Sequence, residues 1–90
     1  MKQASFIVRF TTSAKQSLKK LPSDEQWNIA KKIEALAGEP MPRGSVKLHG
    51  MPKLYRLRSA DYRIGYRINN EELIILVIKI GHRREVYKSS

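Results

Sequence analysis

The chain has 90 residues, 41% of them hydrophobic, which allows a single domain over residues 1–90 with one modest core. Its 18 Lys and Arg residues against 8 Asp and Glu residues give a formal net charge of +10 and favour a polyanionic partner, nucleic acid before an acidic protein. The absence of cysteine excludes disulfides and thiolate metal sites, and no apolar run is long enough to span a bilayer, so we expect a cytoplasmic protein.

The first quarter of the chain predicts a strand followed by a short helix. Residues 5–10 alternate with the period of a half-buried strand, with Phe6, Val8 and Phe10 on one side. The hydroxyl residues at 11–13 offer N-cap oxygens for a helix with an apolar face. Pro22 interrupts this helix, because the residue before a proline avoids the helical conformation.

A second helix is predicted over residues 24–37. Ser23 and Gln26 form a capping-box pattern at its start, and Gly38 is well placed to end it. Its apolar side chains, including Trp27, fall within about half of the helical wheel. The two helices therefore form a hairpin that packs across one face of a sheet.

The second half of the chain predicts a strand meander. Residues 39–52 hold three of the four prolines and form an irregular crossing, with one short strand over residues 46–48. Alternation resumes at 53–58 and again at 62–68, across a tight turn at 59–61. The apolar run LIILVIKI at 73–80 indicates a central strand covered on both faces. The fold class is α+β, in the order β-α-α-β-β-β, with an antiparallel sheet.

Two strands of this meander carry arginines on the sheet face away from the helices. Arg56, Arg58, Arg63 and Arg67 then lie within reach of one phosphate backbone. A solvated basic surface explains the charge equally well, but arginine suits bidentate phosphate contact. Gly65 leaves room for a ligand between Arg63 and Arg67, although a strand glycine also marks a bulge.

Other catalytic constellations are missing. The sequence has no paired carboxylates, no glycine-rich phosphate loop and no Cys or His cluster for a metal, so we expect neither a cofactor nor a metal. Two histidines, His49 and His82, allow comparison with nucleases that use one histidine as base and another as acid. A surface position for His49 and a packing or hydrogen-bonding role for His82 explain them more simply.

Three segments in this order resemble the RelE family of toxins: GMPKLYRLR at 50–58, YRIGY at 62–66 and IGHRREVY at 80–87. The resemblance covers the whole chain in layout and about the last forty residues in detail. It implies ribosome-dependent cleavage of mRNA in the decoding A site, which inhibits translation. It also implies a cognate antitoxin, which the charge of this chain predicts to be acidic, and so a hetero-oligomer.

The resemblance also implies the site residues. The family's arginine of the third strand matches Arg63, its glycine-adjacent arginine matches Arg83 and its C-terminal tyrosine matches Tyr87. We expect these three on a solvent-facing surface outside the core. The family's lysine pair falls on Arg56 and Arg58, and arginine is a far poorer proton acceptor than lysine.

The general base is therefore open between two residues. Tyr87 can act if surrounding positive charge favours its phenolate, whereas Lys47, in a loop, is better suited to contact a phosphate. Further substrate contacts are expected from three basic residues, Arg67, Arg84 and His82.

Two alternatives remain. A ParE-like toxin resembles this architecture but poisons DNA gyrase and does not need the arginine and tyrosine set. A plain nucleic-acid-binding module uses the basic face without chemistry.

Overall fold

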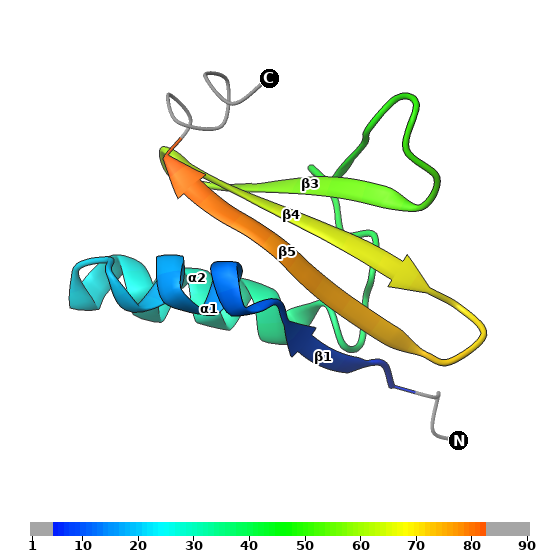
Figure 1. Ribbon diagram of the computed structural model, residues 1–90, viewed down its shortest axis with the longest axis horizontal. Helices are drawn as coiled ribbons and strands as arrows, with labels where there is room; N and C mark the ends of the chain where they lie inside the picture. Colours follow the sequence, from blue (N-terminus) through cyan, green and yellow to red (C-terminus); the bar gives the residue numbers. More distant parts are fainter. Residues whose placement is uncertain (1–4, 83–90) are drawn as a thin grey trace.

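The computed structural model describes residues 5–82, in which two helices lie along one face of a five-stranded sheet (Figure 1). The elements are β1 (Ile7–Phe10), α1 (Thr12–Lys19), α2 (Ser23–Ala35), β2 (Val46–Lys47), β3 (Leu54–Ser59), β4 (Tyr62–Asn69) and β5 (Ile74–His82). The predicted succession of one strand, two helices and a meander is confirmed, including the short strand β2. No helix within residues 5–82 is long and apolar enough to cross a membrane.

The strand order is β1-β5-β4-β3-β2. The meander of β3, β4 and β5 is antiparallel as predicted, but β1 pairs with β5 in parallel, so the sheet is mixed. A parallel pair needs a long crossover connection, which the two helices and the strands after them supply here. The run predicted to be central is therefore interior, next to the middle strand β4.

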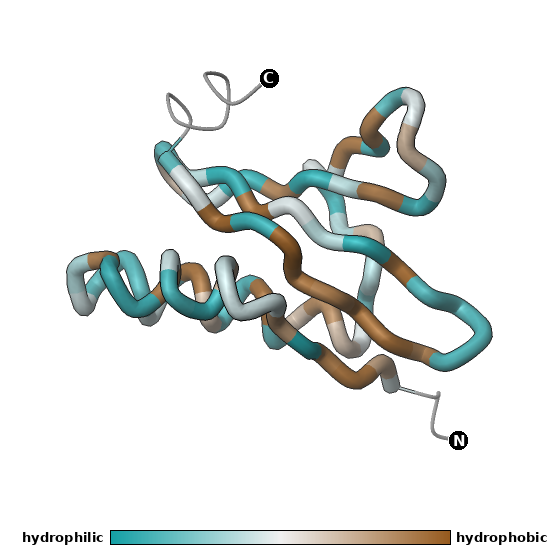
Figure 2. Tube along the Cα trace, in the orientation of Figure 1, coloured by the Kyte–Doolittle hydropathy of each residue, from teal (hydrophilic) through white to brown (hydrophobic). Residues whose placement is uncertain are grey.

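The helices cover only one face of β5. Along this strand Ile75 and Val77 are fully buried, whereas Ile74, Leu76 and Ile78 on the other side are half-buried. Figure 2 shows the apolar run along β5. The prediction that this strand is covered on both faces is wrong, because no second layer lies over the other face among the described residues. We call this uncovered side the open face.

The core lies between the helices and the opposite face of the sheet. Its buried residues come from both layers: Ala14, Ile29, Ile33, Leu36, Leu57, Ile64, Tyr66, Ile68, Ile75, Val77 and Ile80. Trp27 does not join them, since 64% of its surface is exposed and the Lys31 ammonium lies 5.3 Å from its ring centroid. Trp27 comes two residues before the buried Ile29, so its side chain points about 200° away from that of Ile29 around the helix. This explains why the predicted inner position is wrong.

The helix starts differ in how they are capped. Thr11 caps α1 as predicted, because its hydroxyl oxygen accepts a hydrogen bond from the Ala14 amide at 3.1 Å. The capping box predicted for α2 is wrong: Pro22 is the N-cap residue, and the Gln26 side chain instead donates to the Leu18 carbonyl at 2.8 Å. The second helix ends at Ala35, a little before the predicted end.

Candidate nucleic-acid interface

Three arginines from β3 and β4 gather on the open face. Arg58 pairs across the strands with Arg63, and Arg56 pairs with Gly65. Their neighbours along each strand, such as Leu57 and Ile64, are buried in the core against the helices. Because successive side chains of a strand point to opposite faces, the arginines project from the open face. We call Arg56, Arg58 and Arg63 the arginine cluster.

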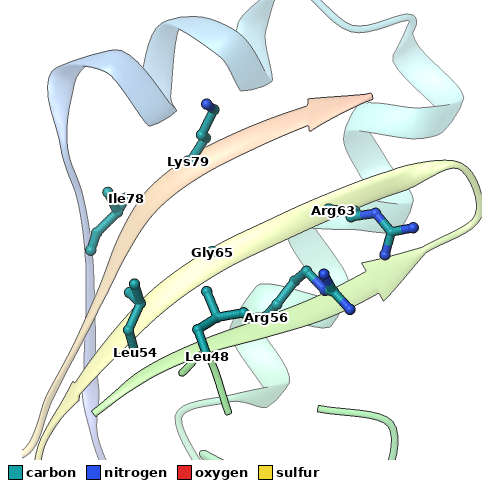
Figure 3. A pocket seen from close by; sticks show the side chains of 7 residues that line it. All are labelled: Leu48, Leu54, Arg56, Arg63, Gly65, Ile78 and Lys79. Carbon is teal, nitrogen blue, oxygen red and sulfur yellow. The ribbon is translucent and has the colours of Figure 1, made fainter. Parts of the chain in front are cut away.

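The arginine cluster lies between two cavities. The first has a volume of about 170 Å³ and an almost entirely apolar lining, to which Arg56, Arg63 and Lys79 contribute mainly the carbon parts of their side chains. Figure 3 shows Gly65 between Leu54 and Ile78 on one side and the guanidinium ends of Arg56 and Arg63 on the other. The second cavity, of about 290 Å³, is lined by all three arginines of the cluster. A phosphate group placed between the cavities therefore meets several guanidinium groups, which bind phosphate oxygens well.

Arg63 is buried, with only 5% of its surface exposed. The expectation that it lies on a solvent-facing surface is wrong. It belongs to the middle strand, where Arg58 flanks it on one side and the buried Gly81 on the other. A side chain packed in this way is held in one orientation, and its charge acts on an anion through less water than an exposed arginine does.

Gly65 lies at a β-bulge, which confirms one interpretation of this glycine, and it also lines the first cavity. Gly65 pairs with Lys79 and Tyr66 pairs with Val77, which leaves Ile78 without an opposite residue in β4. The bulge interrupts alternation, and Ile78 and Lys79 consequently line the same cavity. The Thr11 hydroxyl donates a hydrogen bond to the Ile78 carbonyl at 3.1 Å and ties the bulge to the start of α1.

Sequence reasoning missed three basic residues near the arginine cluster. Lys79 lines the first cavity, and Lys32 and Arg43 line the second. The Lys32 ammonium also donates a hydrogen bond to the Arg58 carbonyl at 2.9 Å, which links α2 to β3. Lys79 had a signal in the sequence, as the one charge within the apolar run 73–80. The other two lie in a helix and an irregular segment, where periodicity does not reveal their proximity to the sheet.

Six other predicted site residues lie apart from the cluster or outside the described residues. Arg67 is exposed, pairs with Leu54 and lines neither cavity. Lys47 belongs to β2 and lines a different cavity together with His49. His82 lies on the helix side of the sheet, where its ring meets that of Tyr62 edge to face at 5.6 Å. The predicted residues Arg83, Arg84 and Tyr87 lie outside the described residues.

A buried tyrosine ties the irregular segment to the sheet. The Tyr66 hydroxyl donates a hydrogen bond to the Pro40 carbonyl at 2.8 Å. Burial raises the pKa of this phenol above its usual value, a side-chain hydrogen bond with Ser45 lowers it in part, and electrostatic interaction with Tyr55 raises it slightly. This contact anchors the segment that carries Arg43 to the second cavity.

Metal ligands do not gather in this region. Across residues 5–82 no group of three or more His, Cys, Asp or Glu side chains is positioned to hold a metal ion. The charged residues that line the two cavities are instead arginines and lysines.

Comparisons with known proteins agree on toxins of type II toxin–antitoxin systems. A family model described as the ParE toxin of the type II toxin-antitoxin system parDE matches residues 8–87. The mRNA interferase toxin RelE of Escherichia coli is 31% identical over 90 residues, covering 96% of this chain and 94% of that protein. Toxin RelG of Mycobacterium tuberculosis is 30% identical over 84 residues, covering 92% and 97%.

Solved structures show the same fold. The archaeal RelE-RelB complex from Pyrococcus horikoshii contains a chain that superimposes with a TM-score of 0.79 at 28% identity. The match covers 88% of this chain and 96% of that chain. On these grounds the chain belongs to the RelE family within the RelE/ParE superfamily of type II toxin–antitoxin toxins.

Proposed function

We propose that this RelE-like toxin is a ribosome-dependent endoribonuclease that cleaves mRNA in the ribosomal A site and so inhibits translation. The observation that carries the proposal is the arginine cluster between two cavities on the open face. Two relatives that carry the name mRNA interferase support the reaction class. A translating ribosome supplies the substrate, so the protein acts in the cytoplasm.

The arginine cluster suits the most demanding part of RNA cleavage. The 2′-oxygen attacks the neighbouring phosphorus while the bond from phosphorus to the 5′-oxygen breaks, giving a 2′,3′-cyclic phosphate and a 5′-hydroxyl. The 2′-hydroxyl loses its proton to a base, and the 5′-oxygen gains one from an acid. Negative charge builds on the phosphorane between these steps, and Arg56, Arg58 and Arg63 supply fixed positive charge there. Because these cations neutralise the phosphorane, the mechanism requires no metal.

The general base must come from outside the cluster, because an arginine side chain is not deprotonated in proteins. Tyr87 and Lys47 remain the two candidates. Lys47 lines a different cavity from the arginine cluster, which favours Tyr87. Arg83 is proposed as a further contact to the scissile phosphate, with Arg84 as a neighbouring substrate contact.

A cognate acidic antitoxin is the proposed inhibitor. Relatives of known structure include RelE-RelB toxin-antitoxin complexes, and the net charge of +10 favours an acidic partner. Coexpression of the antitoxin is expected to rescue growth, and the two proteins form a hetero-oligomer.

Cleavage of mRNA on programmed ribosomes tests the proposed function. We expect Arg56→Ala and Arg58→Ala to slow cleavage by about 10²-fold or more, the loss typical of a group that stabilises transition-state charge. Arg9→Ala is the matched control, because Arg9 is an exposed arginine of the edge strand β1. Cleavage at the normal rate by both cluster variants, with unchanged melting temperatures, contradicts the proposal.

The alternatives give different outcomes in the same set of assays. The matching family model is described as a ParE toxin, so the gyrase poisoning that we expect of a ParE-like toxin is the second candidate. A gyrase poison inhibits DNA supercoiling in a purified reaction and leaves ribosomal mRNA intact. A plain binding module does neither, although it still binds RNA.

A further inference from the structure

The first cavity, which we call the Gly65 cavity, has an apolar lining with two guanidinium groups close to one side. One side is aliphatic, formed by Leu48, Leu54 and Ile78. On the other side Arg56 and Arg63 line the cavity mainly with the carbon parts of their side chains, and their guanidinium groups lie just beyond it, pointing away from Gly65 (Figure 3). A ligand that fills this cavity therefore has a flat or rounded apolar part joined closely to an anion.

The volume of about 170 Å³ limits what can enter. Cavities that bind drug-sized molecules measure roughly 300–1,000 Å³. The Gly65 cavity is smaller, so it accommodates a single ring system rather than a larger ligand. The cavity depends on Gly65, because any side chain at this position projects from the open face between the two sides.

We propose that the Gly65 cavity holds one nucleobase of the RNA beside the phosphate that the arginine cluster binds. This inference rests on the proposed function and specifies how the substrate is seated. A nucleotide joins an unsaturated ring to a phosphate through one sugar, which matches the order of the two sides. Enzymes that act on nucleic acids commonly hold an unstacked base between aromatic or apolar side chains.

The aliphatic side also determines which properties of the base affect binding. Leu48, Leu54 and Ile78 offer no side-chain hydrogen-bond donor or acceptor to a base edge. Binding to this side is therefore sensitive to the presence and size of the ring more than to its hydrogen-bonding pattern. Removing the base entirely should slow cleavage more than exchanging it for another base of the same size.

Abasic mRNAs test the inference with the unaltered protein. Each mRNA carries one abasic nucleotide at a different position around the cut phosphate, and single-turnover cleavage is measured on programmed ribosomes with toxin below saturation. We expect one position at which loss of the base slows cleavage by about fivefold or more, the lower end of the range for a single bound base. Equal rates at every position overturn the inference.

Gly65→Val assigns the effect to this cavity. A Cβ at position 65 lies 3.8 Å from the Lys79 Cβ and 3.9 Å from its carbonyl oxygen, ordinary contact distances, and the backbone is not left-handed. The variant should fold, since valine suits a strand. It should cleave intact mRNA about fivefold more slowly than the unaltered protein does. On the abasic mRNA that the unaltered protein cleaves slowly, the two proteins should cleave at the same rate. Gly38→Val is the control, because a Cβ there meets no atom within 4 Å.

The outcomes separate the two proposals. If the unaltered toxin cuts no mRNA, the proposed function fails and the base cavity fails with it. If cleavage is normal but the abasic loss persists unchanged in Gly65→Val, the ribosome reads the base and the inference is overturned. If Gly65→Val cleaves normally and loses only antitoxin affinity, the cavity receives an antitoxin side chain, and the inference is overturned as well.

Discussion

Tyr66→Phe removes one hydroxyl that joins the core to the edge of the candidate site. The ring of Tyr66 is fully buried, and its hydroxyl donates to the Pro40 carbonyl at 2.8 Å. Phenylalanine keeps the ring and its packing. The change therefore removes only the hydrogen bonds of the hydroxyl, to the Pro40 carbonyl and the Ser45 side chain, which anchor the segment that contains Arg43 and lines the cavity beside the arginine cluster.

The size of the effect follows from burial at the two ends of the hydrogen bond to Pro40. A buried acceptor left without its donor costs about 1–3 kcal/mol. Pro40 is half-buried, so water reaches its carbonyl in part, and we expect a loss of about 1–2 kcal/mol in the free energy of unfolding. In a domain of this size each kcal/mol lowers the melting temperature by about 4–8 °C, so Tm should fall by roughly 5–15 °C.

Urea and thermal unfolding, followed by circular dichroism, measure this loss. Tyr55→Phe is the matched control, because Tyr55 pairs with Tyr66 across the strands and stacks on it with ring centroids 5.9 Å apart. Its hydroxyl makes no hydrogen bond within residues 5–82, so its removal should change Tm by only a degree or two. Equal shifts in both variants would show that the Pro40 contact contributes nothing to stability.

Three further predictions concern stability. Ile33→Ala should cost about 2–5 kcal/mol in chemical unfolding, because Ile33 is 1% exposed, whereas Ile7→Ala at 56% exposure should cost less than about 1 kcal/mol; similar losses would place the inner face of α2 elsewhere. Thr11→Ala should lower the free energy of unfolding by about 0.5–2 kcal/mol and Thr11→Ser much less, because serine keeps the hydroxyl for the Ala14 amide and the Ile78 carbonyl; equal losses in calorimetry would contradict this role. Because the pKa of buried Tyr66 is raised, the phenol of the unfolded chain loses its proton at a lower pH than the phenol of the folded protein. The protonated phenol therefore stabilises the folded state below pH 10.0, and this contribution is lost as pH rises above that value. Between pH 9 and 11 the free energy of unfolding should fall more steeply for the unaltered protein than for Tyr66→Phe.

Local patterns predicted most of the fold. Alternation at 53–58 and 62–68 fixed which residues face the helices, and the cap at Thr11 marked the start of α1. The parallel pairing of β1 was missed, because strand patterns carry no information about which edge of the sheet a distant strand joins. The exposure of Trp27 was missed because half of the helical wheel was assigned to the buried face, and Trp27 lies at the edge of that half.

The candidate site was predicted less completely, and the bulge explains much of the difference. Strict alternation places Ile78 and Lys79 on opposite faces, whereas the bulge brings both to the Gly65 cavity. The burial of Arg63 also depends on tertiary position, since only the place of β4 in the middle of the sheet encloses this side chain. Sequence periods describe single strands, and both features arise from the way in which strands pair.

Two hydrogen bonds join the site to the helix layer, in addition to the packing of the shared core. The Thr11 hydroxyl binds the carbonyl of the bulge residue Ile78, and the Lys32 ammonium binds the carbonyl of Arg58. Each bond fixes the backbone of a strand that carries a cavity residue, from the opposite face of the sheet. A substitution in the helices can therefore displace a cavity wall or an arginine of the cluster without touching RNA. Loss of activity in such a variant identifies a residue that positions the site, and only the melting temperature measured beside it separates positioning from unfolding.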